Sequence, residues 1–433
     1  MPARIILIAA MVALHLLGSR SQQFHLSFAL HLVASGAFML ALLAVVKRQR
    51  LPGFGEAFGI ALLLRLIALP LAPVLSDDFH RYMFEGRLVL EGVNPYLTPP
   101  SADSVFHLRG PTWHLINNPD IPAAYPPAMQ GALALGVLIA DGALGMKLVF
   151  GFFDLLIFVA LWLGLPRLGV AREMAVAYGW CPLVILEFAG EGHGDSLAVL
   201  LLVLAVLVRG RGQGLLSGAA LAGATAAKLM PVVLLPFLLR RSGSWRLDRA
   251  KVATVLPSFL IVLTLFYLPF LAPPGEMFRG TLEYAGRWRS NDSLFVLIHW
   301  MTESWFVRDT GGPWLQEAQR LSKLPLALLG IGVLTCAWLR RLPVERAAWW
   351  FFLFFVAAAP TMHPWYLAFL VPWLCLWPNP GLLAFTGTVY LAYHVLPGWI
   401  ESRVWEEKAW VKVVEYLPFY LGIIWLSRQR GER

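Results

Sequence analysis

Apolar runs of membrane-spanning length recur along this 433-residue chain, and they limit its fold more than any other feature. Hydrophobic residues make up 58% of the sequence and charged residues only 14%, which is more apolar surface than one soluble core can bury. Inside a bilayer the backbone must satisfy its own hydrogen bonds, and an apolar run does so as a helix. We therefore predict an all-α polytopic integral membrane protein, folded as a single domain over residues 1–433.

The predicted fold is a helical bundle of about 12 to 14 transmembrane segments. The segments expected in the bilayer are residues 4–18, 26–46, 55–75, 143–164, 173–190, 195–208, 251–271, 323–339, 344–360, 364–377, 380–397 and 410–426. Two further apolar stretches fit less well, because 128–140 is short and 214–239 is interrupted by Lys228 and Pro231. Either would form a re-entrant or broken hairpin, which is tolerated where the backbone lines a cavity.

Positive charge indicates the sidedness of these segments. Loops rich in Lys and Arg and poor in acid occur at residues 47–50, 209–211, 240–251, 340–341 and 428–433. Such loops are cytoplasmic, which places both termini inside the cell. The two long loops, 76–127 and 272–322, then lie on the outer face of the inner membrane. The net charge of +9 is therefore a signal of topology and of contact with membrane lipid, and it does not indicate nucleic acid.

Several kinds of chemistry lack their sequence signals. The chain has no GxxxxGK[ST], no GxGxxG opening a helix, no HExxH and no GxSxG. No cytoplasmic segment is long enough for a nucleotide-binding domain, so an enzyme of this shape would take an activated group from the membrane, where a lipid phosphate is the natural carrier. The three cysteines, Cys181, Cys336 and Cys375, lie in apolar segments without CxxC spacing. The cysteines therefore predict neither a disulfide framework nor a zinc site, and we expect no cofactor.

Two adjacent carboxylates, Asp77 and Asp78, open an amphipathic stretch at the start of the first outer loop. At helical spacing, one side carries Phe79, Tyr82, Met83, Gly86, Val89 and Leu90, and the other carries His80, Arg81, Glu85, Arg87 and Glu91. This pattern predicts a helix at the membrane interface with residues 76–78 at its amino end. Arg81 shares a face with Asp78, so one group can accept a proton while the other holds a phosphate. The alternative is that Ser76, Asp77 and Asp78 only cap the helix.

Other ionisable residues gather at predicted outer membrane edges. Glu191, His193 and Asp195 lie within five residues bounded by glycines, where a short turn joins two spans. Three titratable groups at one membrane depth favour function over packing.

His363 begins another span at this edge, followed by Trp365 and Tyr366, which are typical interface anchors. In the second outer loop, Arg287 and Arg289 are able to bind a phosphate, or alternatively lipid head groups.

Two cations lie inside apolar segments, Arg65 and Lys228. Intramembrane charge is costly and usually faces a cavity or an opposite charge. We expect these two residues to line a donor pocket or to pair with acids such as Glu187 or Asp154.

These motifs, taken together and in order, resemble the GT-C glycosyltransferases over nearly the whole chain. The matching elements are Asp77-Asp78 with Arg81-Tyr82, Glu85-Gly86-Arg87, Asn94-Pro95-Tyr96, Tyr125-Pro126-Pro127, Gly192-His193-Gly194-Asp195, Lys228 with Pro231, Arg287-Trp288-Arg289 and His363-Pro364-Trp365-Tyr366. Within that superfamily the chain is most similar to the polyprenyl-phosphate-mannose-dependent mannosyltransferases, glycosyltransferase family 87. The resemblance implies a helical bundle with interfacial helices in an outer loop, a lipid-linked sugar donor and an acidic catalytic base in that loop.

The spacing of Asp78, Arg81 and Tyr82 is similar to the Asp-Glu-x-Arg-Tyr element of the lipid A aminoarabinose transferases. This likeness favours Asp78 over Asp77 as the base. Phe79 stands where that element has a second acid, which argues against an obligatory metal.

The resulting hypothesis is an inverting hexosyl transfer, most simply of mannose, to a hydroxyl of a glycan or glycolipid acceptor. Asp78 takes the hydroxyl proton while polyprenyl phosphate leaves. The cations expected to stabilise the departing phosphate are Arg81, Lys228, Arg287, Arg289 and His363. The residues expected to contact the sugar or acceptor are Tyr82, Glu191, His193, Asp195, Trp365 and Tyr366. The alternatives are a glycan ligase that moves a lipid-linked oligosaccharide, and a lipid or sugar transporter without transfer chemistry.

Overall fold

The computed structural model describes residues 2–17, 24–208, 212–306 and 314–431. Within these ranges the chain is built from helices, and its only β pairing consists of two isolated bridges. Five helices are long and apolar enough to cross a membrane: Phe24–Val46, Ala143–Leu168, Arg249–Phe270, Arg320–Leu339 and Ala409–Arg428. The prediction of an all-α polytopic membrane protein is confirmed. The predicted cytoplasmic residues 209–211, 432 and 433 lie outside the described ranges.

The chain forms two compact units, each assembled from separate stretches of sequence. Unit 1 comprises Met1–Phe79, Leu135–Val203 and Pro364–Arg433, and unit 2 comprises His80–Ala134 and Leu204–His363. Three helices begin in one unit and end in the other: α4 (Asp78–Leu90), α5 (Pro127–Ile139) and α9 (Asp195–Leu207).

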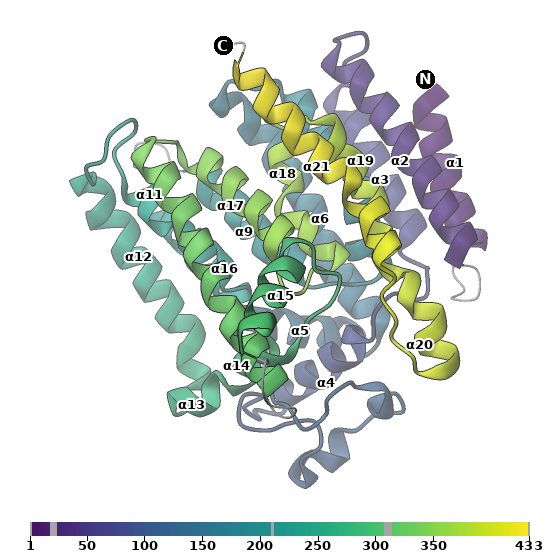
Figure 1. Cartoon of the computed structure of the whole chain (residues 1–433), viewed down its shortest axis with the longest axis vertical. Helices are drawn as coiled ribbons and strands as arrows, with labels where there is room; N and C mark the ends of the chain where they lie inside the picture. The colour runs from purple at the N-terminus through teal and green to yellow at the C-terminus, as the bar shows by residue number, and fades with distance from the viewer. Residues whose placement is uncertain (1, 18–23, 209–211, 307–313, 432–433) are drawn as a thin grey trace. The chain divides into compact units, whose positions relative to one another are not determined.

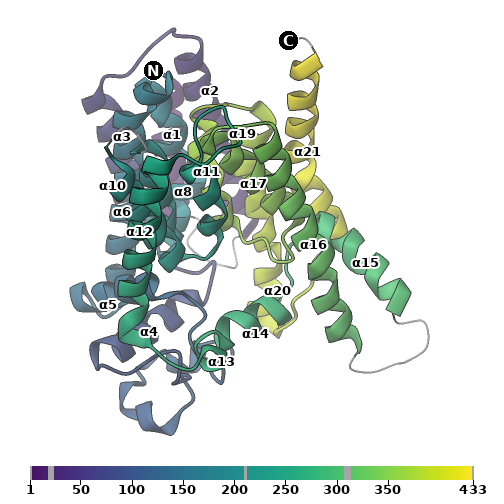
Figure 2. The ribbon, with the colours of Figure 1, turned by 90° about the vertical axis from the view of Figure 1, so that its left-hand side faces the viewer.

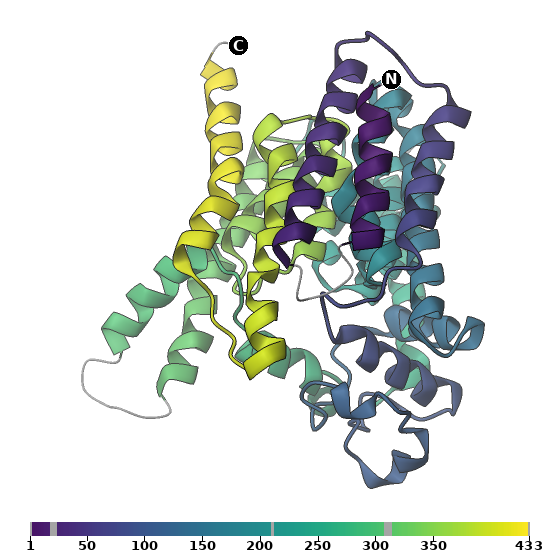
Figure 3. The same ribbon diagram turned by 90° about the vertical axis from the view of Figure 1, so that its right-hand side faces the viewer.

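Unit 1 is a bundle of long outer helices around short helical pieces (Figures 1 and 3). Its helices are α1 (Pro2–Leu17), α2 (Phe24–Val46), α3 (Phe54–Ala68), α6 (Ala143–Gly164), α7 (Val176–Gly179), α8 (Pro182–Val184), α18 (Val371–Leu374), α19 (Pro380–Thr388), α20 (Leu396–Ser402) and α21 (Ala409–Gly431). Its 3-10 segments are η4 (Leu165–Leu168), η5 (Arg172–Ala175), η9 (Pro364–Phe369) and η10 (Val389–Val395), and η6 (Ile185–Gly190) is a π-helix. Helix α1 packs against α2 and α3, while α19 packs against both α2 and α21.

In unit 2, α10 lies along α12, and α16 packs against α14, α15 and α17 (Figure 2). Its helices are α10 (Gly214–Ala227), α11 (Leu235–Leu239), α12 (Arg249–Tyr267), α13 (Pro274–Met277), α14 (Arg279–Arg287), α15 (Leu294–Phe306), α16 (Trp314–Leu339) and α17 (Val344–Ala358). Its 3-10 segments are η2 (Asp103–Leu108), η3 (Trp113–Leu115), η7 (Met230–Leu234) and η8 (Leu268–Phe270). Because α16 begins at Trp314, the last part of the predicted outer loop 272–322 is helical.

The ends of several helices have local causes. Asp248 caps α12, since its side chain accepts hydrogen bonds from the backbone N–H groups of Ala250 and Lys251. Asn379 caps α19 in the same way through the N–H of Leu382, and Pro380 occupies the first helical position. Polar residues therefore fix where the apolar segments start.

Three predicted spans are not single helices. Residues 173–190 form parts of η5, α7, α8 and η6; residues 364–377 contain η9 and α18; and residues 380–397 contain α19, η10 and the start of α20. Prolines at 182, 364, 372 and 397 remove backbone donors and limit helix propagation in these segments. The predicted interruption of 214–239 is confirmed, because α10 ends at Ala227 and Lys228 has extended backbone.

A buried ion pair joins two helices in the core of unit 1. The Arg65 Nε of α3 lies 2.8 Å from the Asp154 Oδ2 of α6, and their side chains are 5% and 0% exposed. The Tyr178 hydroxyl donates to the other Asp154 oxygen at 2.7 Å. Of the two acids proposed as partners for the intramembrane cations, Asp154 is confirmed for Arg65.

Replacing Arg65 with Met leaves the Asp154 carboxylate without its counter-charge in an apolar interior. We expect a loss of about 3–5 kcal/mol of stability, measured as a lower midpoint of thermal unfolding in detergent. The double variant Arg65→Met, Asp154→Leu should recover much of this loss, because no charge is then left unpaired. Arg50→Ala, which removes a half-exposed surface cation, serves as the control. A wild-type midpoint for Arg65→Met would contradict this assignment.

Candidate active site

A turn between η6 and α9 collects three buried titratable residues of unit 1. The π-helix ends at Gly190, Gly192 has a φ of +78°, and Asp195 is the first residue of α9. Glu191, His193 and Asp195 are 4%, 1% and 0% exposed. A side chain at Gly192 would be strained by the left-handed backbone and would come within 3.3 Å of the Lys147 side chain. The predicted turn is present, and the structure buries it inside the unit.

The imidazole of His193 contacts Glu187 and Trp365. Its Nδ1 lies 2.9 Å from the Glu187 Oε2. The Tyr393 hydroxyl lies 2.8 Å and 3.0 Å from the two Glu187 oxygens and donates to this carboxylate. The imidazole ring stacks on Trp365 with ring centroids 3.8 Å apart and an angle of 17° between the ring planes. Glu187, one of the acids expected to pair with Arg65 or Lys228, instead pairs with a histidine six residues along the chain.

The electrostatics of the turn are set by burial and by mutual charge. Burial raises the pKa of Glu191 to about 7, although His193 and the backbone N–H of Leu75 oppose the shift. Burial lowers the pKa of His193, but the hydrogen bond and charge of Glu187, together with the charges of Asp78 and Glu191, outweigh it and raise that pKa above its usual value. The turn therefore favours a protonated imidazole close to the Asp78 carboxylate.

Two charged side chains form hydrogen bonds with the backbone of the segment before Asp77 and Asp78. The Glu191 Oε2 accepts a hydrogen bond from the Leu75 backbone N–H at 2.9 Å. The Lys147 ammonium group, from α6, donates to the backbone carbonyls of Leu69 and Leu71. These contacts satisfy backbone groups in the irregular segment between α3 and the two aspartates.

Helix α4 begins at Asp78, as predicted, and the Ser76 hydroxyl accepts the Asp78 N–H at 3.1 Å. Both Asp77 and Asp78 are partly exposed. The predicted division of the α4 surface is wrong at two positions, because Glu85 is buried and Leu90 is 48% exposed.

The physical reason is that α4 buries a different stripe within unit 2. Phe84 and Leu88 form a core cluster with Val105 and Ile116. Glu85 is turned inward, where the Gln130 amide donates to it at 2.8 Å.

Within unit 2, the Arg81 side chain forms hydrogen bonds with backbone carbonyls. Its guanidinium donates to the carbonyls of Asn117, Asn118 and Ile121 at 2.6, 2.8 and 3.0 Å. It also lies 3.5 Å from the Glu85 carboxylate. In this arrangement the side chain ties α4 to the end of the first outer loop.

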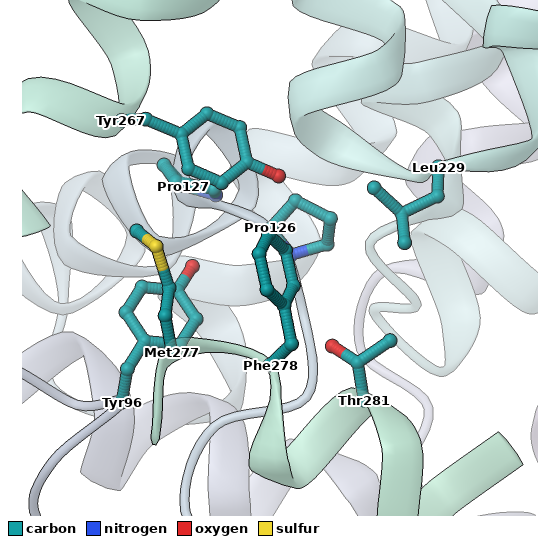
Figure 4. Close-up of a pocket in the computed structure, with 8 residues that line it drawn as sticks. All are labelled: Tyr96, Pro126, Pro127, Leu229, Tyr267, Met277, Phe278 and Thr281. Atoms are coloured by element: carbon teal, nitrogen blue, oxygen red, sulfur yellow. The ribbon is translucent and has the colours of Figure 1, made fainter. Parts of the chain in front are cut away.

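Tyr82 and Lys228 meet around Tyr125 in unit 2. The hydroxyls of Tyr82 and Tyr125 are 3.0 Å apart, and the Lys228 ammonium lies 5.2 Å from the centre of the Tyr125 ring. A small pocket adjoins this cluster and is partly open to the exterior. It is lined by Tyr96, Pro126, Pro127, Leu229, Tyr267, Met277, Phe278 and Thr281 (Figure 4). The lining is mostly apolar and starts one residue from both Tyr125 and Lys228.

The two arginines of the second outer loop have acidic partners. Arg287 lies 2.6 Å from Glu283, and Arg289 lies 2.7 Å from Asp292. The backbone of Ser290 forms hydrogen bonds with Pro360 and Met362, at 3.1 and 2.9 Å. The loop that carries Arg289 is thus fixed to the strand-like segment immediately before His363, which is partly buried.

The structure brings the predicted site residues together in two groups. Unit 1 gathers Asp78, Glu191 and His193 with Trp365 stacked on the imidazole, and Tyr366 is buried beside Trp365 in the chain. Unit 2 gathers Tyr82 and Lys228 around Tyr125, and separately joins the Arg289 loop to the chain before His363. Among the described residues, no three His, Cys, Asp or Glu side chains are grouped as metal ligands.

Three residues with clear partners in the structure were not predicted from the sequence: Lys147, Tyr125 and Tyr393. Lys147 is a charge inside an apolar run, so the rule that identified Arg65 would also have identified it. Tyr125 belongs to one of the motifs quoted above. For Tyr393 the sequence gives no comparable signal, because its role depends on contact with Glu187, 206 positions away.

Comparison with known proteins defines the class to which this helical membrane chain belongs. A family model described as the N-terminal domain of alpha-(1->6)-mannopyranosyltransferase matches residues 6–241, more than half of the chain. The chain is therefore a member of the alpha-(1->6)-mannopyranosyltransferase family, which confirms the resemblance to mannosyltransferases.

One relative is alpha-(1->6)-mannopyranosyltransferase A of Mycobacterium tuberculosis, which is 25% identical over 360 residues. The alignment covers 76% of this chain and 67% of that protein. No solved structure matches the chain.

If Glu191 pins the approach to the aspartates, Glu191→Ala should release the Leu75 amide. We expect hydrogen–deuterium exchange of the Leu75 amide to become faster by about tenfold or more, since this amide loses its charge-assisted hydrogen bond. Peptide-resolved mass spectrometry in detergent measures this, with the exposed Glu401→Ala as the control. Unchanged exchange at Leu75 in Glu191→Ala would show that the carboxylate does not hold this segment.

Proposed function

We propose that this chain transfers one mannose from a polyprenyl-phosphate donor to a hydroxyl of a glycan or glycolipid, on the outer face of the cell membrane and with inversion at the sugar. Membership of the mannopyranosyltransferase family supports the sugar and the reaction class. The membrane-spanning helices support a donor that is itself a lipid. The observation that carries the proposal is Asp78, a partly exposed carboxylate at the start of α4 next to the charged turn of unit 1.

Exposure distinguishes Asp78 from the other acids of the cluster. A general base must reach the acceptor hydroxyl directly. Glu187, Glu191 and Asp195 are almost fully buried, whereas Asp77 and Asp78 are partly exposed. Asp78 is the proposed base because its negative charge also interacts with the His193 imidazole. Asp77 is its alternate.

Charge that develops on the departing phosphate requires cations. Lys228 is the favoured candidate, since the aromatic face of Tyr125 and an apolar pocket both adjoin it. The pocket would receive the first isoprene units of the donor while the ammonium contacts the phosphate. Further candidates are Arg81, Arg287, Arg289 and His363. To bind the phosphate, the three arginines would have to release the groups that they contact now.

The residues predicted from the sequence to contact the sugar or acceptor are all buried in the structure, and we propose that they position the groups that contact the substrate: Tyr82, Glu191, His193, Asp195, Trp365 and Tyr366. The arrangement of the helix ends in unit 1 supports the proposed topology: α1 begins and α21 ends at the same end of the unit (Figures 1 and 3). An even number of crossings between these two ends agrees with both termini in the cytoplasm.

The proposed reaction is tested with purified protein, radiolabelled polyprenyl-phosphate-mannose and a membrane lipid extract. We expect label to move into a new product, and Asp78→Asn or Asp78→Ala to lower the rate by about a hundredfold or more, the usual contribution of a general base. Asp120→Asn, in an exposed part of the first outer loop, is the matched control.

Unfolding midpoints of all variants should match the wild type in detergent. Full activity in both Asp78 variants would refute the assignment of the base. Movement of intact donor across vesicles without any labelled product would instead favour a transporter, and transfer only of oligosaccharides would favour a ligase.

Filling the pocket beside Lys228 should weaken binding of the prenyl chain. For Leu229→Trp we expect the KM for polyprenyl-phosphate-mannose to rise by about tenfold, equivalent to about 1.4 kcal/mol. The KM for a mannosyl phosphate with only a methyl group in place of the prenyl chain should stay unchanged. Leu215→Trp, on an exposed part of α10, is the control. Equal KM values for Leu229→Trp and wild type with the polyprenyl donor would exclude this pocket from donor binding.

A further inference from the structure

The buried pair of Glu187 and His193 is costly to maintain for stability alone. Both side chains are removed from solvent, at 0% and 2% exposure. Desolvating two charges usually offsets their attraction, so apolar residues of similar size would stabilise the unit at least as well. The pair is therefore a candidate for a functional role.

The geometry fixes both the proton and the ring plane of His193. The Nδ1 of His193 lies 2.9 Å from the Glu187 Oε2, a separation that favours a proton on this nitrogen. Tyr393 holds the Glu187 carboxylate through both oxygens, and Trp365 lies flat against the imidazole. A histidine oriented by a carboxylate that is itself hydrogen-bonded has little freedom to change its position or tautomer.

Charged and titratable groups approach this imidazole from several elements. Glu187 comes from η6, Glu191 from the following turn and Asp78 from the start of α4, and all three act on the charge of His193. Tyr393 of η10 contacts the Glu187 carboxylate, and Lys147 of α6 acts on Glu191. Among the acids that act on His193, Asp78 is the partly exposed one.

We propose that His193, kept as a cation by Glu187 and Tyr393, is a positioning residue that holds the Asp78 carboxylate ionised and oriented for the acceptor. This inference rests on the proposed function. In the step, the acceptor oxygen forms a bond to the anomeric carbon and its proton passes to Asp78. The bond from that carbon to the phosphate oxygen breaks, and its electron pair leaves with the phosphate. His193 keeps its proton throughout.

The pH dependence of transfer tests this role. Wild-type activity should fall on the alkaline side as His193 loses its proton. Glu187→Gln removes the negative charge that retains the proton, so this alkaline limb should move to lower pH by about one unit or more. His193→Gln should lower kcat by about tenfold, abolish the limb and leave the KM for the donor unchanged. Asp154→Asn, which disturbs a buried ion pair elsewhere in unit 1, should reduce stability without moving the limb.

A second readout is independent of turnover. With ¹⁵N-labelled histidine, the midpoint of the His193 imidazole titration should fall in Glu187→Gln, and by a smaller amount in Asp78→Asn. An alkaline limb unmoved in a folded and active Glu187→Gln protein would overturn the inference, and so would a His193 titration unaffected by Asp78→Asn. Absence of any mannosyl transfer by the wild type would refute the proposed function instead, while the titration would still show whether the two residues are coupled.

Discussion

Charge buried in an apolar interior must find a partner, and this requirement organises unit 1. The Arg65 guanidinium is neutralised by Asp154, and the His193 imidazole pairs with Glu187. Lys147 binds the carbonyls of Leu69 and Leu71, at the end of α3. Each group would be destabilising alone, because the surrounding helices offer no water to solvate it. Satisfying these charges ties α3, α6 and the π-helix together and defines the path of the chain toward Asp78.

The charged turn also depends on broken helices. A continuous helix through residues 173–190 would satisfy its own backbone without help from side chains. Instead a π-helix ends at Gly190, and a left-handed glycine at 192 turns the chain toward Asp195. Irregular backbone of this kind persists within a membrane protein only where protein groups satisfy it. Beside this break, the Glu191 carboxylate and the Lys147 ammonium form hydrogen bonds with the irregular segment that follows α3. The charged turn therefore lies at the point where the helix is interrupted.

Sequence patterns predicted what depends on local composition. Spans such as 26–46 and 143–164 agree with α2 and α6 to within a few residues, since length and hydropathy decide them. The start of α4 at Asp78 was likewise predicted from its polar amino end. The breaks within 173–190 and 380–397 were not predicted, because these spans were assigned from apolar content alone, although Pro182 and Pro397 are visible in the sequence. Burial of Glu85 depends on Gln130, a distant residue, and no periodicity along α4 contains that information. The partners of His193 are fixed by the tertiary fold in the same way.

We propose that the aspartates open onto the outer face of the membrane, where a lipid-linked sugar can reach them. Labelling of single cysteines in intact cells measures this directly, after the three native cysteines are replaced by serine. Ser76→Cys, two residues before Asp78, should react with a membrane-impermeant maleimide added outside. Arg48→Cys, in the basic loop after α2, should react only after the cells are opened. Labelling of Arg48→Cys from outside, with Ser76→Cys protected until lysis, would contradict the account.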